Sequence, residues 1–178
     1  MEVRRLSAQA IVRHAAVEDA DAIGRVRVAA WQAAYRGHMP ADYLDSLDPR
    51  ANLDDLRAVL KSREPPFLVR VAELGGEVAA FSILGRPRYA AGADTLELWA
   101  LNVAPRYWRR GIAWALVGQS LDDARSSGAL TLELWCIPTN RAARALYESR
   151  GFNRTGQHRT TAALTGHPLD EIAYRAAL

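Results

Sequence analysis

Residues 95–119 read TLELWALNVAPRYWRRGIAWALVGQ, and this stretch predicts a strand, a short turn and a helix. Residues 95–103 are apolar or β-branched at all but two positions, so both faces of the strand carry apolar side chains. This pattern is typical of an inner strand that is covered on both sides. Pro105 ends the strand because proline has no amide hydrogen to donate to a neighbouring strand. After the turn, apolar residues recur at helical spacing.

The turn Trp108-Arg109-Arg110-Gly111 has the features of an anion-binding site. The first amides of a helix have no partners within it, and together with the helix dipole they favour negative charge. Gly111 lets the backbone approach a ligand closely, while Arg109 and Arg110 add two cations. The same residues are also compatible with an ordinary strand-to-helix connection and a solvated basic turn.

The composition predicts a single globular domain over residues 1–178, because 49% of the residues are hydrophobic and 24% are charged. A net charge of +3 does not by itself indicate a nucleic-acid partner. The one cysteine, Cys136, excludes an internal disulfide, and the four histidines show no metal-ligand spacing. We find no signal peptide and no apolar run long enough for a membrane span. We therefore expect a cytoplasmic monomer or homodimer without nucleic-acid, membrane or metal partners.

The order of the elements predicts the fold class. Strands are expected near residues 10–13, 67–74, 77–84, 95–103, 130–137, 152–160 and 169–177. Helices are expected near 18–37, 39–47, 48–61 and 140–150, and after the basic turn up to Gly128. This order predicts an α/β (α+β) protein with a mixed, largely antiparallel sheet of six to seven strands and helices on both faces.

A second pattern lies on the helix that follows Thr139. Asn140, then Ala143 or Arg144, and then Tyr147 fall on one stripe of this helix, at i, i+3 or i+4, and i+7. Leu146 lies on the adjacent stripe, where it can pack on the sheet and turn the first stripe toward a cleft. Alternatively, Tyr147 is a core aromatic residue and Asn140 is simply a first-turn residue.

Together the two patterns resemble the Gcn5-related N-acetyltransferase (GNAT) family over about residues 11–178. In that family a strand ending in Val-x-Pro precedes a turn of the type Q/R-x-x-G-x-G/A, and here Val103-Ala104-Pro105 and the segment WRRGIA at 108–113 fill these places. The second motif, Asn-x-x-Ala-x-x-Leu-Tyr followed by Gly-Phe, matches residues 140–147 and 151–152. Trp108 and Arg109 depart from the pattern, which allows a side-chain contact from Arg109 in place of a backbone contact.

The resemblance implies that the central strands splay apart and that acetyl-CoA, the co-substrate, enters between them. Its pantetheine would pair with the strand ending at Val103, whose amide would stabilise the oxyanion, and its pyrophosphate would lie on the turn. The residues implied for acetyl-CoA binding are Leu101, Asn102, Val103, Trp108, Arg109, Arg110, Gly111, Ile112, Ala113, Asn140 and Ala143. Tyr147 would protonate the leaving thiolate, which makes it the first predicted catalytic residue.

Glu97 is the predicted general base, which would remove a proton from the acceptor amine. A carboxylate inside an apolar strand costs free energy unless it has a use, and burial would raise its pKa toward neutrality. Alternatively, Glu97 faces solvent at the end of the strand or pairs with an arginine. Asp94 and a chain of water molecules are the other candidates for the base.

The acceptor is expected to be the primary amine of a small molecule. Trp31, Tyr35, Trp99 and Trp135 indicate an aromatic, enclosed pocket, although Trp31 can equally well fill the core. Acetylation of a protein N-terminus or lysine is the alternative reaction, and it would need an open groove. A non-catalytic sensor module that binds acyl-CoA is the alternative outside enzymes, but it would not require the phenol of Tyr147.

Overall fold

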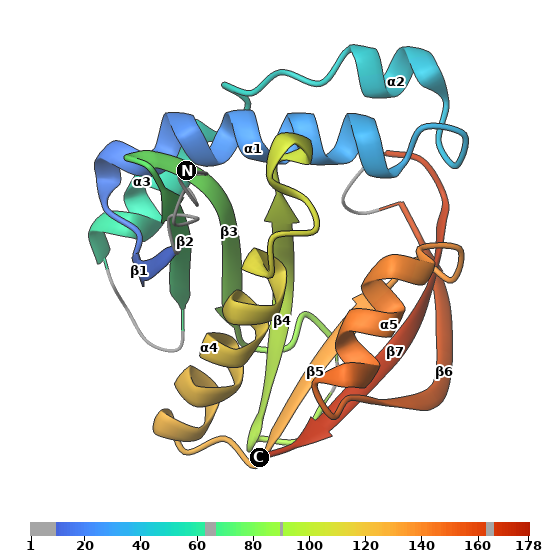
Figure 1. Cartoon of the computed structure of the whole chain (residues 1–178). Helices are drawn as coiled ribbons and strands as arrows, with labels where there is room; N and C mark the ends of the chain where they lie inside the picture. Colours follow the sequence, from blue (N-terminus) through green and yellow to red (C-terminus); the bar gives the residue numbers. More distant parts are fainter. Residues whose placement is uncertain (1–9, 63–66, 90, 163–165) are drawn as a thin grey trace, which may run out of the picture.

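The computed structural model describes residues 10–62, 67–89, 91–162 and 166–178, and its centre is a seven-stranded sheet (Figure 1). The order across the sheet is β1-β2-β3-β4-β5-β7-β6. The strands are β1 (Ile11–His14), β2 (Leu68–Leu74), β3 (Glu77–Gly85), β4 (Thr95–Val103), β5 (Thr131–Cys136), β6 (Asn153–Thr161) and β7 (Leu169–Ala177). Every neighbouring pair is antiparallel except β4 with β5, so the predicted mixed, largely antiparallel sheet is confirmed.

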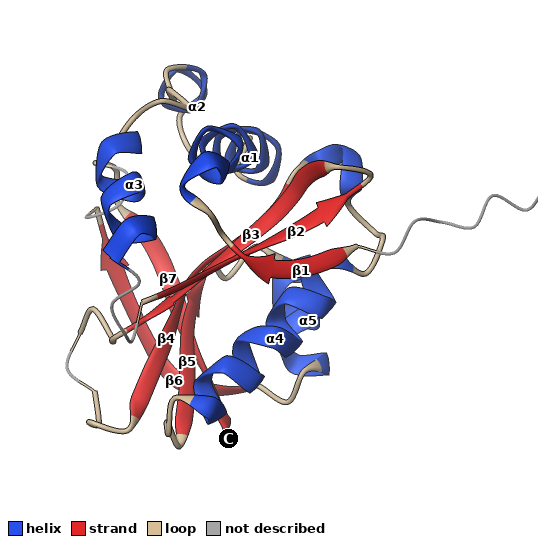
Figure 2. Cartoon of the chain, turned by 90° about the vertical axis from the view of Figure 1, so that its left-hand side faces the viewer, coloured by secondary structure: helices blue, strands red, loops and turns tan. Residues whose placement is uncertain are grey.

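Helices lie on both faces of the sheet, as the sequence predicts (Figure 2). The first group is α1 (Ala20–Ala34), α2 (Ala41–Asp45) and α3 (Leu53–Ser62), and the second is α4 (Ile112–Ser126) and α5 (Arg141–Ser149). The third helix begins later than expected because residues 48–52 form a turn, in which the Asp48 side chain accepts the Arg50 amide. None of the helices in the described part of the chain combines the length and apolar character needed to cross a membrane.

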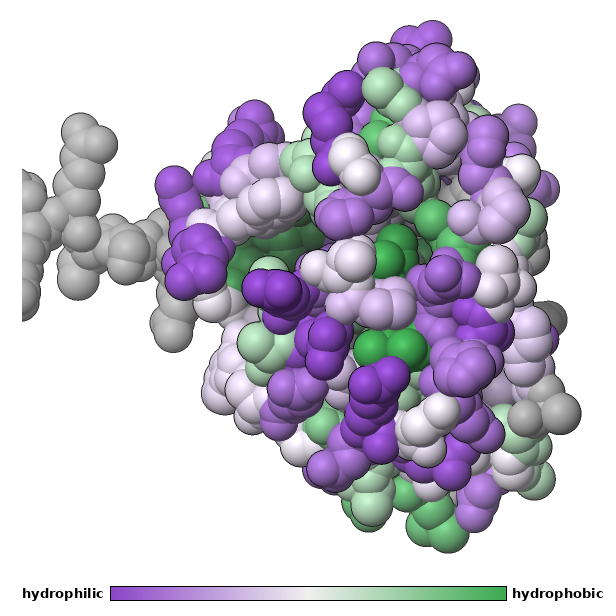
Figure 3. Space-filling model, turned by 90° about the vertical axis from the view of Figure 1, so that its right-hand side faces the viewer, coloured by the Kyte–Doolittle hydropathy of each residue, from purple (hydrophilic) through white to green (hydrophobic). Residues whose placement is uncertain are grey.

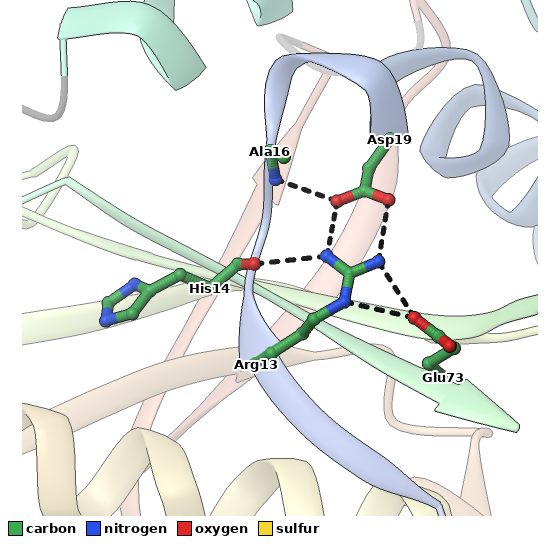
Figure 4. A network of polar contacts seen from close by, with 5 residues as sticks. All are labelled: Arg13, His14, Ala16, Asp19 and Glu73. Carbon is green, nitrogen blue, oxygen red and sulfur yellow. Dashed lines mark hydrogen bonds and ion pairs between the residues drawn. The ribbon is translucent and has the colours of Figure 1, made fainter. Parts of the chain in front are cut away.

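The start of α1 is held to the edge of the sheet by Arg13 on β1 (Figure 4). Its guanidinium donates to both carboxylate oxygens of Asp19, at 2.7 and 3.0 Å, and to Glu73 on β2 at 3.1 Å. Asp19 also accepts the amide of Ala16 at 2.7 Å, and the contact with Arg13 lowers the pKa of this carboxyl below its usual value. One side chain therefore fixes where α1 leaves the sheet.

The two faces of the sheet have separate apolar cores. One core joins α4 and α5 to the sheet through buried residues such as Val117, Leu134 and Phe152. The other joins α1 and α3 to β2 and β3 through residues such as Ile23, Leu60 and Phe81. The helices of each layer bury their apolar stripe against one face, as expected for packed layers.

The strands β4 and β5 separate halfway along their length. Their pairing runs from Thr95 with Thr131 to Leu98 with Leu134, whereas β4 continues to Val103. The register of β4 against β3 also shifts next to Leu98, which indicates a bulge that bends the strand. Ala100 still packs with α1 and Leu101 with α4, so both faces of β4 are covered as expected for an inner strand, but residues 99–103 are only half-buried. The physical reason is the loss of the neighbouring strand.

Candidate active site

A cavity of about 510 Å³ lies where β4 leaves β5. It is lined by the end of β4, the start of α4, the end of α1, and one side of α5 that includes Tyr147. The lining residues predicted for acetyl-CoA are Leu101, Asn102, Val103, Trp108, Arg109, Gly111, Ile112, Ala113, Asn140 and Ala143. The structure thus brings together every residue of that set except Arg110. Seen from the side of α5, the surface has apolar patches recessed among hydrophilic side chains (Figure 3).

The basic turn before α4 has a left-handed backbone at two positions. Arg109 has φ of 62° and Gly111 has φ of 77°. A residue other than glycine is strained there, which explains physically why the family pattern has glycine where this chain has Arg109. The indole of Trp108 donates to the carbonyl of Val103 at 2.7 Å and so ties the turn to the end of β4. Arg110 is not a lining residue, and its guanidinium carbon lies 5.7 Å from the ring centre of Tyr107, which does line the cavity.

Tyr147 belongs both to the cavity wall and to the apolar core. Its ring packs 6.0 Å from the ring of Phe152, and the residue is buried. Burial raises the pKa of its phenol above the ordinary value, and Cys136 and Tyr35 add to that shift. Its hydroxyl makes no hydrogen bond to the described part of the chain. The two interpretations of Tyr147 from sequence are therefore compatible, because one edge packs in the core while the residue lines the cavity.

Asn140 forms the N-cap of α5. Its side-chain oxygen accepts the amide of Ala143 at 3.1 Å, which satisfies one of the free amides at the start of the helix. Leu146 packs against the core as expected, but it also lines the cavity. The cap positions both Asn140 and Ala143 in the cavity wall, and a direct contact with acetyl-CoA stays a prediction.

Glu97 forms an ion pair with Arg88, which is one of the alternatives that the sequence allowed for this residue. It is only 1% exposed, and it accepts the backbone amide of Arg88 at 2.8 Å and the Nε of the same residue at 3.0 Å. It lies four residues before Leu101, or about 13 Å along an extended strand. Asp94 is exposed at the start of β4, about 23 Å along the strand from Leu101. A role for either carboxylate as the base stays a prediction, and these positions do not favour it.

Of the four aromatic residues predicted for the acceptor pocket, Tyr35 lines this cavity and the other three are not among its lining residues, so their contact with an acceptor stays a prediction. Tyr35 lines the cavity, and Trp31 packs edge-on against it at 5.3 Å between ring centres without being among the lining residues. Trp99 instead packs against Phe67, with 4.6 Å between ring centres. Trp135 contacts the guanidinium of Arg159 and lies near the ring of Tyr89. The reason is the pleat of the sheet, because Trp99 and Trp135 alternate with Leu98 and Leu134 and point away from the core of α4 and α5.

Part of the cavity wall comes from residues that the sequence patterns do not single out. The end of α1, including Ala30, Ala33 and Ala34, lines the cavity, and so does Trp114. Trp114 is 53% exposed, and the guanidinium carbon of Arg150 lies 3.7 Å from its ring centre. A large exposed aromatic residue at the start of a helix with a predicted anion site is a signal that could have identified Trp114. Nothing in the sequence places the end of α1 beside α5.

Comparison with known protein families and sequences supports the same assignment. A model described as the acetyltransferase (GNAT) family matches residues 16–152. The uncharacterized N-acetyltransferase YuaI of Bacillus subtilis is 28% identical over 129 residues, which are 72% of this chain and 72% of that protein. The [ribosomal protein bS18]-alanine N-acetyltransferase of Escherichia coli is 38% identical over 78 residues, 44% of this chain and 49% of that protein. This second match therefore spans about half of the relative.

Solved structures show the same fold at low sequence identity. The PaiA N-acetyltransferase of Thermoplasma acidophilum, solved in complex with coenzyme A, superposes with a TM-score of 0.76 at 17% identity, covering 96% of this chain and 99% of that one. YncA of Salmonella typhimurium, described as a putative acetyltransferase and solved with acetyl-CoA, gives 0.74 at 24% identity, covering 96% and 95%. Because the family model covers more than half of the sequence, the chain belongs to the acetyltransferase (GNAT) family, as its motifs predict, and it is an N-acetyltransferase.

Proposed function

We propose that this protein transfers the acetyl group of acetyl-CoA directly to the primary amine of a small molecule. Acetyl-CoA is its co-substrate, in keeping with its membership of the acetyltransferase family. The observation that carries the proposal is the cavity at the separation of β4 and β5. The end of β4, the basic turn before α4 and Tyr147, which the reaction requires, all line this one cavity.

The residues present fit the parts of acetyl-CoA. The edge of β4 beyond Leu98 has no strand partner on the side of β5, so its backbone is free to pair with the amide groups of pantetheine. The turn at Arg109 and Gly111 leads into α4, whose first amides and dipole suit the pyrophosphate. The side chain of Arg109 in the cavity wall adds a positive charge.

The reaction then needs a proton donor and a proton acceptor. The amine nitrogen forms a bond to the acetyl carbon, the bond from that carbon to sulfur breaks, and the thiolate takes a proton from Tyr147. The raised pKa of Tyr147 keeps the phenol protonated at neutral pH, so it can act as this donor. Since Glu97 is held by Arg88, we propose that the proton of the attacking amine leaves through water rather than directly to a carboxylate.

Acetylation of a protein N-terminus is a second candidate function. It is favoured by the 38% identity to the bS18-alanine N-acetyltransferase of Escherichia coli, which acts on a ribosomal protein. That match covers 44% of this chain, so it does not extend to all the elements around the acceptor. The free hydroxyl of Tyr147 in the cavity favours an enzyme over a sensor that only binds acyl-CoA.

The test is an assay of thiol release from acetyl-CoA with a panel of acceptors. The panel contains small amines, polyamines, amino acids and a short peptide that begins with alanine and ends in an amide. We expect release with at least one small acceptor and a higher kcat/KM for it than for the peptide. Release with the peptide alone would favour the second candidate. Binding of acetyl-CoA without release in any sample would contradict the proposal and favour the sensor.

A further inference from the structure

The face of the sheet opposite α4 and α5 carries buried carboxylates, each paired with an arginine. The pairs are Glu97 with Arg88, Glu133 with Arg175, and Glu171 with Arg159. In the view of Figure 2, α1 and α3 cover β2 and β3 on this face, while β7 and β6 carry no helix there in the described part of the chain. All three carboxylates are already neutralised by an arginine. This half of the face therefore has no unpaired carboxylate among these three to attract a polycation such as a polyamine.

Arg159 differs from the other two arginines in its surroundings. Its guanidinium carbon lies 3.8 Å from the ring centre of Trp135 and 3.8 Å from that of Tyr89, so the group contacts both rings, whose planes are tilted by 57°. Its Nε donates to Glu171 at 2.8 Å, and its Nη2 lies 2.7 Å from the same oxygen without the alignment of a hydrogen bond. Its Nη1 is buried and makes no hydrogen bond to the described part of the chain. A buried charged donor without an acceptor costs free energy, which a ligand oxygen would recover.

Arg159 lies at the point where β5 separates from β4. Trp135, on which it stacks, is the first residue of β5 beyond the last pair with β4, and it lies opposite Ala173 on β7. Glu171 lies two residues from Ala173 on the same face of β7. The cavity lies at the same separation of β4 and β5, so the pair of Arg159 and Glu171 lies where the two strands part, on the face opposite α4 and α5.

We propose that Arg159 binds a carboxylate of the acceptor, so that the acceptor class is a small amine that also carries a carboxylate, as an amino acid does. This inference rests on the proposed small-molecule function and names its substrate class. A carboxylate is planar and accepts from guanidinium nitrogens in its own plane, and the Nη1 of Arg159 is the nitrogen without an acceptor. Both Nη atoms of Arg159 are buried in this structure, so binding requires Tyr89, which contacts the guanidinium and is 44% exposed, to turn aside.

The first experiment compares acceptors that share one side chain but differ in the carboxylate. Initial rates of thiol release give kcat/KM for an amino acid, for its carboxamide and for the decarboxylated amine, over several side chains. We expect the amino acid to be preferred by about 10- to 100-fold, the range of a hydrogen bond to a charged group. Equal values for the acid and the carboxamide would overturn the inference. An amidated peptide that begins with alanine and reacts at least as fast as the acid would also overturn it.

Variants then test whether Arg159 is the source of the preference. The double variant Arg159→Gln/Glu171→Gln removes both charges while the two amides can still pair, and we expect the ratio of acid to carboxamide to fall close to one. The matched control, Glu133→Gln/Arg175→Gln, removes an ion pair on the same face and should keep the ratio. A ratio that persists in the first variant would overturn the inference.

A second variant tests the same inference in case the double variant does not fold. Arg159→Lys keeps the charge next to Glu171 but lacks the planar fork, so it should lower the ratio at unchanged melting temperature. An unchanged ratio in this variant would again overturn the inference. Release with no acceptor at all would overturn the proposed function and this inference together, whereas release without preference for the acid overturns the inference alone.

Discussion

The carboxylate of Glu97 accepts hydrogen bonds from both the backbone amide and the side chain of Arg88, its one partner among the residues that the structure describes. The two residues are nine positions apart, and the arginine follows the end of β3. A carboxylate with this partner is in place to hold the loop after β3 against the sheet. The same contact competes with a role as a base, because a proton acceptor must turn a free lone pair toward the amine.

Glu97→Gln is expected to lower the free energy of unfolding by about 3 kcal/mol or more, because it leaves the guanidinium of Arg88 next to a neutral partner in a buried site. Denaturation in urea measures the change. Glu77→Gln is the matched control, since Glu77 pairs with Arg106 on the exposed surface and should change stability little. Normal stability of Glu97→Gln combined with loss of the acidic limb of the pH profile would restore Glu97 as the base.

Tyr147→Phe is expected to lower kcat by about 10- to 100-fold, at or below the low end for a general acid, because a thiolate also leaves without help. Stability and the KM for acetyl-CoA should change little, since the hydroxyl makes no hydrogen bond to the described part of the chain. Tyr174→Phe is the control, because its hydroxyl binds Glu148 at 2.8 Å and Arg144 at 3.0 Å. It should lower the melting temperature and keep kcat. Normal turnover of Tyr147→Phe would remove Tyr147 from the mechanism.

The pH dependence of kcat follows from the same residue. Burial raises the pKa of Tyr147 above its ordinary value of 10.0, so the folded protein keeps this proton to higher pH than the unfolded chain does. We therefore expect no fall in kcat from deprotonation of Tyr147 up to about pH 10. This difference between the two states also contributes to the free energy of unfolding. The contribution is fully present below pH 10 and is lost at higher pH, as the phenol of Tyr147 loses its proton in the folded protein. An alkaline limb near pH 8 that is absent from Tyr147→Phe would contradict this expectation.

Arg109→Gly and Arg110→Gly are expected to change stability in opposite directions. Arg109 has a left-handed backbone with φ of 62°, so glycine relieves strain and raises the free energy of unfolding by about 1 kcal/mol. Arg110 is not among the residues with positive φ, so glycine there only adds freedom to the unfolded chain and lowers stability. Calorimetric titration should show weaker acetyl-CoA binding for Arg109→Gly, because Arg109 lines the cavity. Equal stability changes would contradict the backbone assignment.

The thiol of Cys136 is expected to resist alkylation in the folded protein. Burial raises its pKa from 9.0 to about 12, which lowers the thiolate fraction near pH 8 by about a thousandfold. Reaction with iodoacetamide, followed by mass spectrometry, should therefore be slow until denaturant is added, with free glutathione as the reference. Alkylation of the folded protein at the rate of glutathione would show that the thiol is open to the cavity.

The sequence by itself determined the elements that are local in the chain. The stretch from β4 to α4 is specified by an apolar run, a proline and a glycine, each of which acts on its own neighbours. For this reason the strand bounds of β4, the turn and the stripe of α5 were predictable, and most residues of the two motifs lie in one cavity. The fold class followed from the order of these elements.

Only the tertiary structure decided which distant side chains meet. The bulge next to Leu98 and the pleat of the sheet send Trp99 and Trp135 away from the cavity, and no local pattern shows a bulge of this kind. The partners of Glu97 and Glu171 depend on a loop after β3 and on the register of β6 with β7. A shift of one residue in that register would turn Arg159 to the other face of the sheet, so its contact with the two rings is set by the pairing of strands.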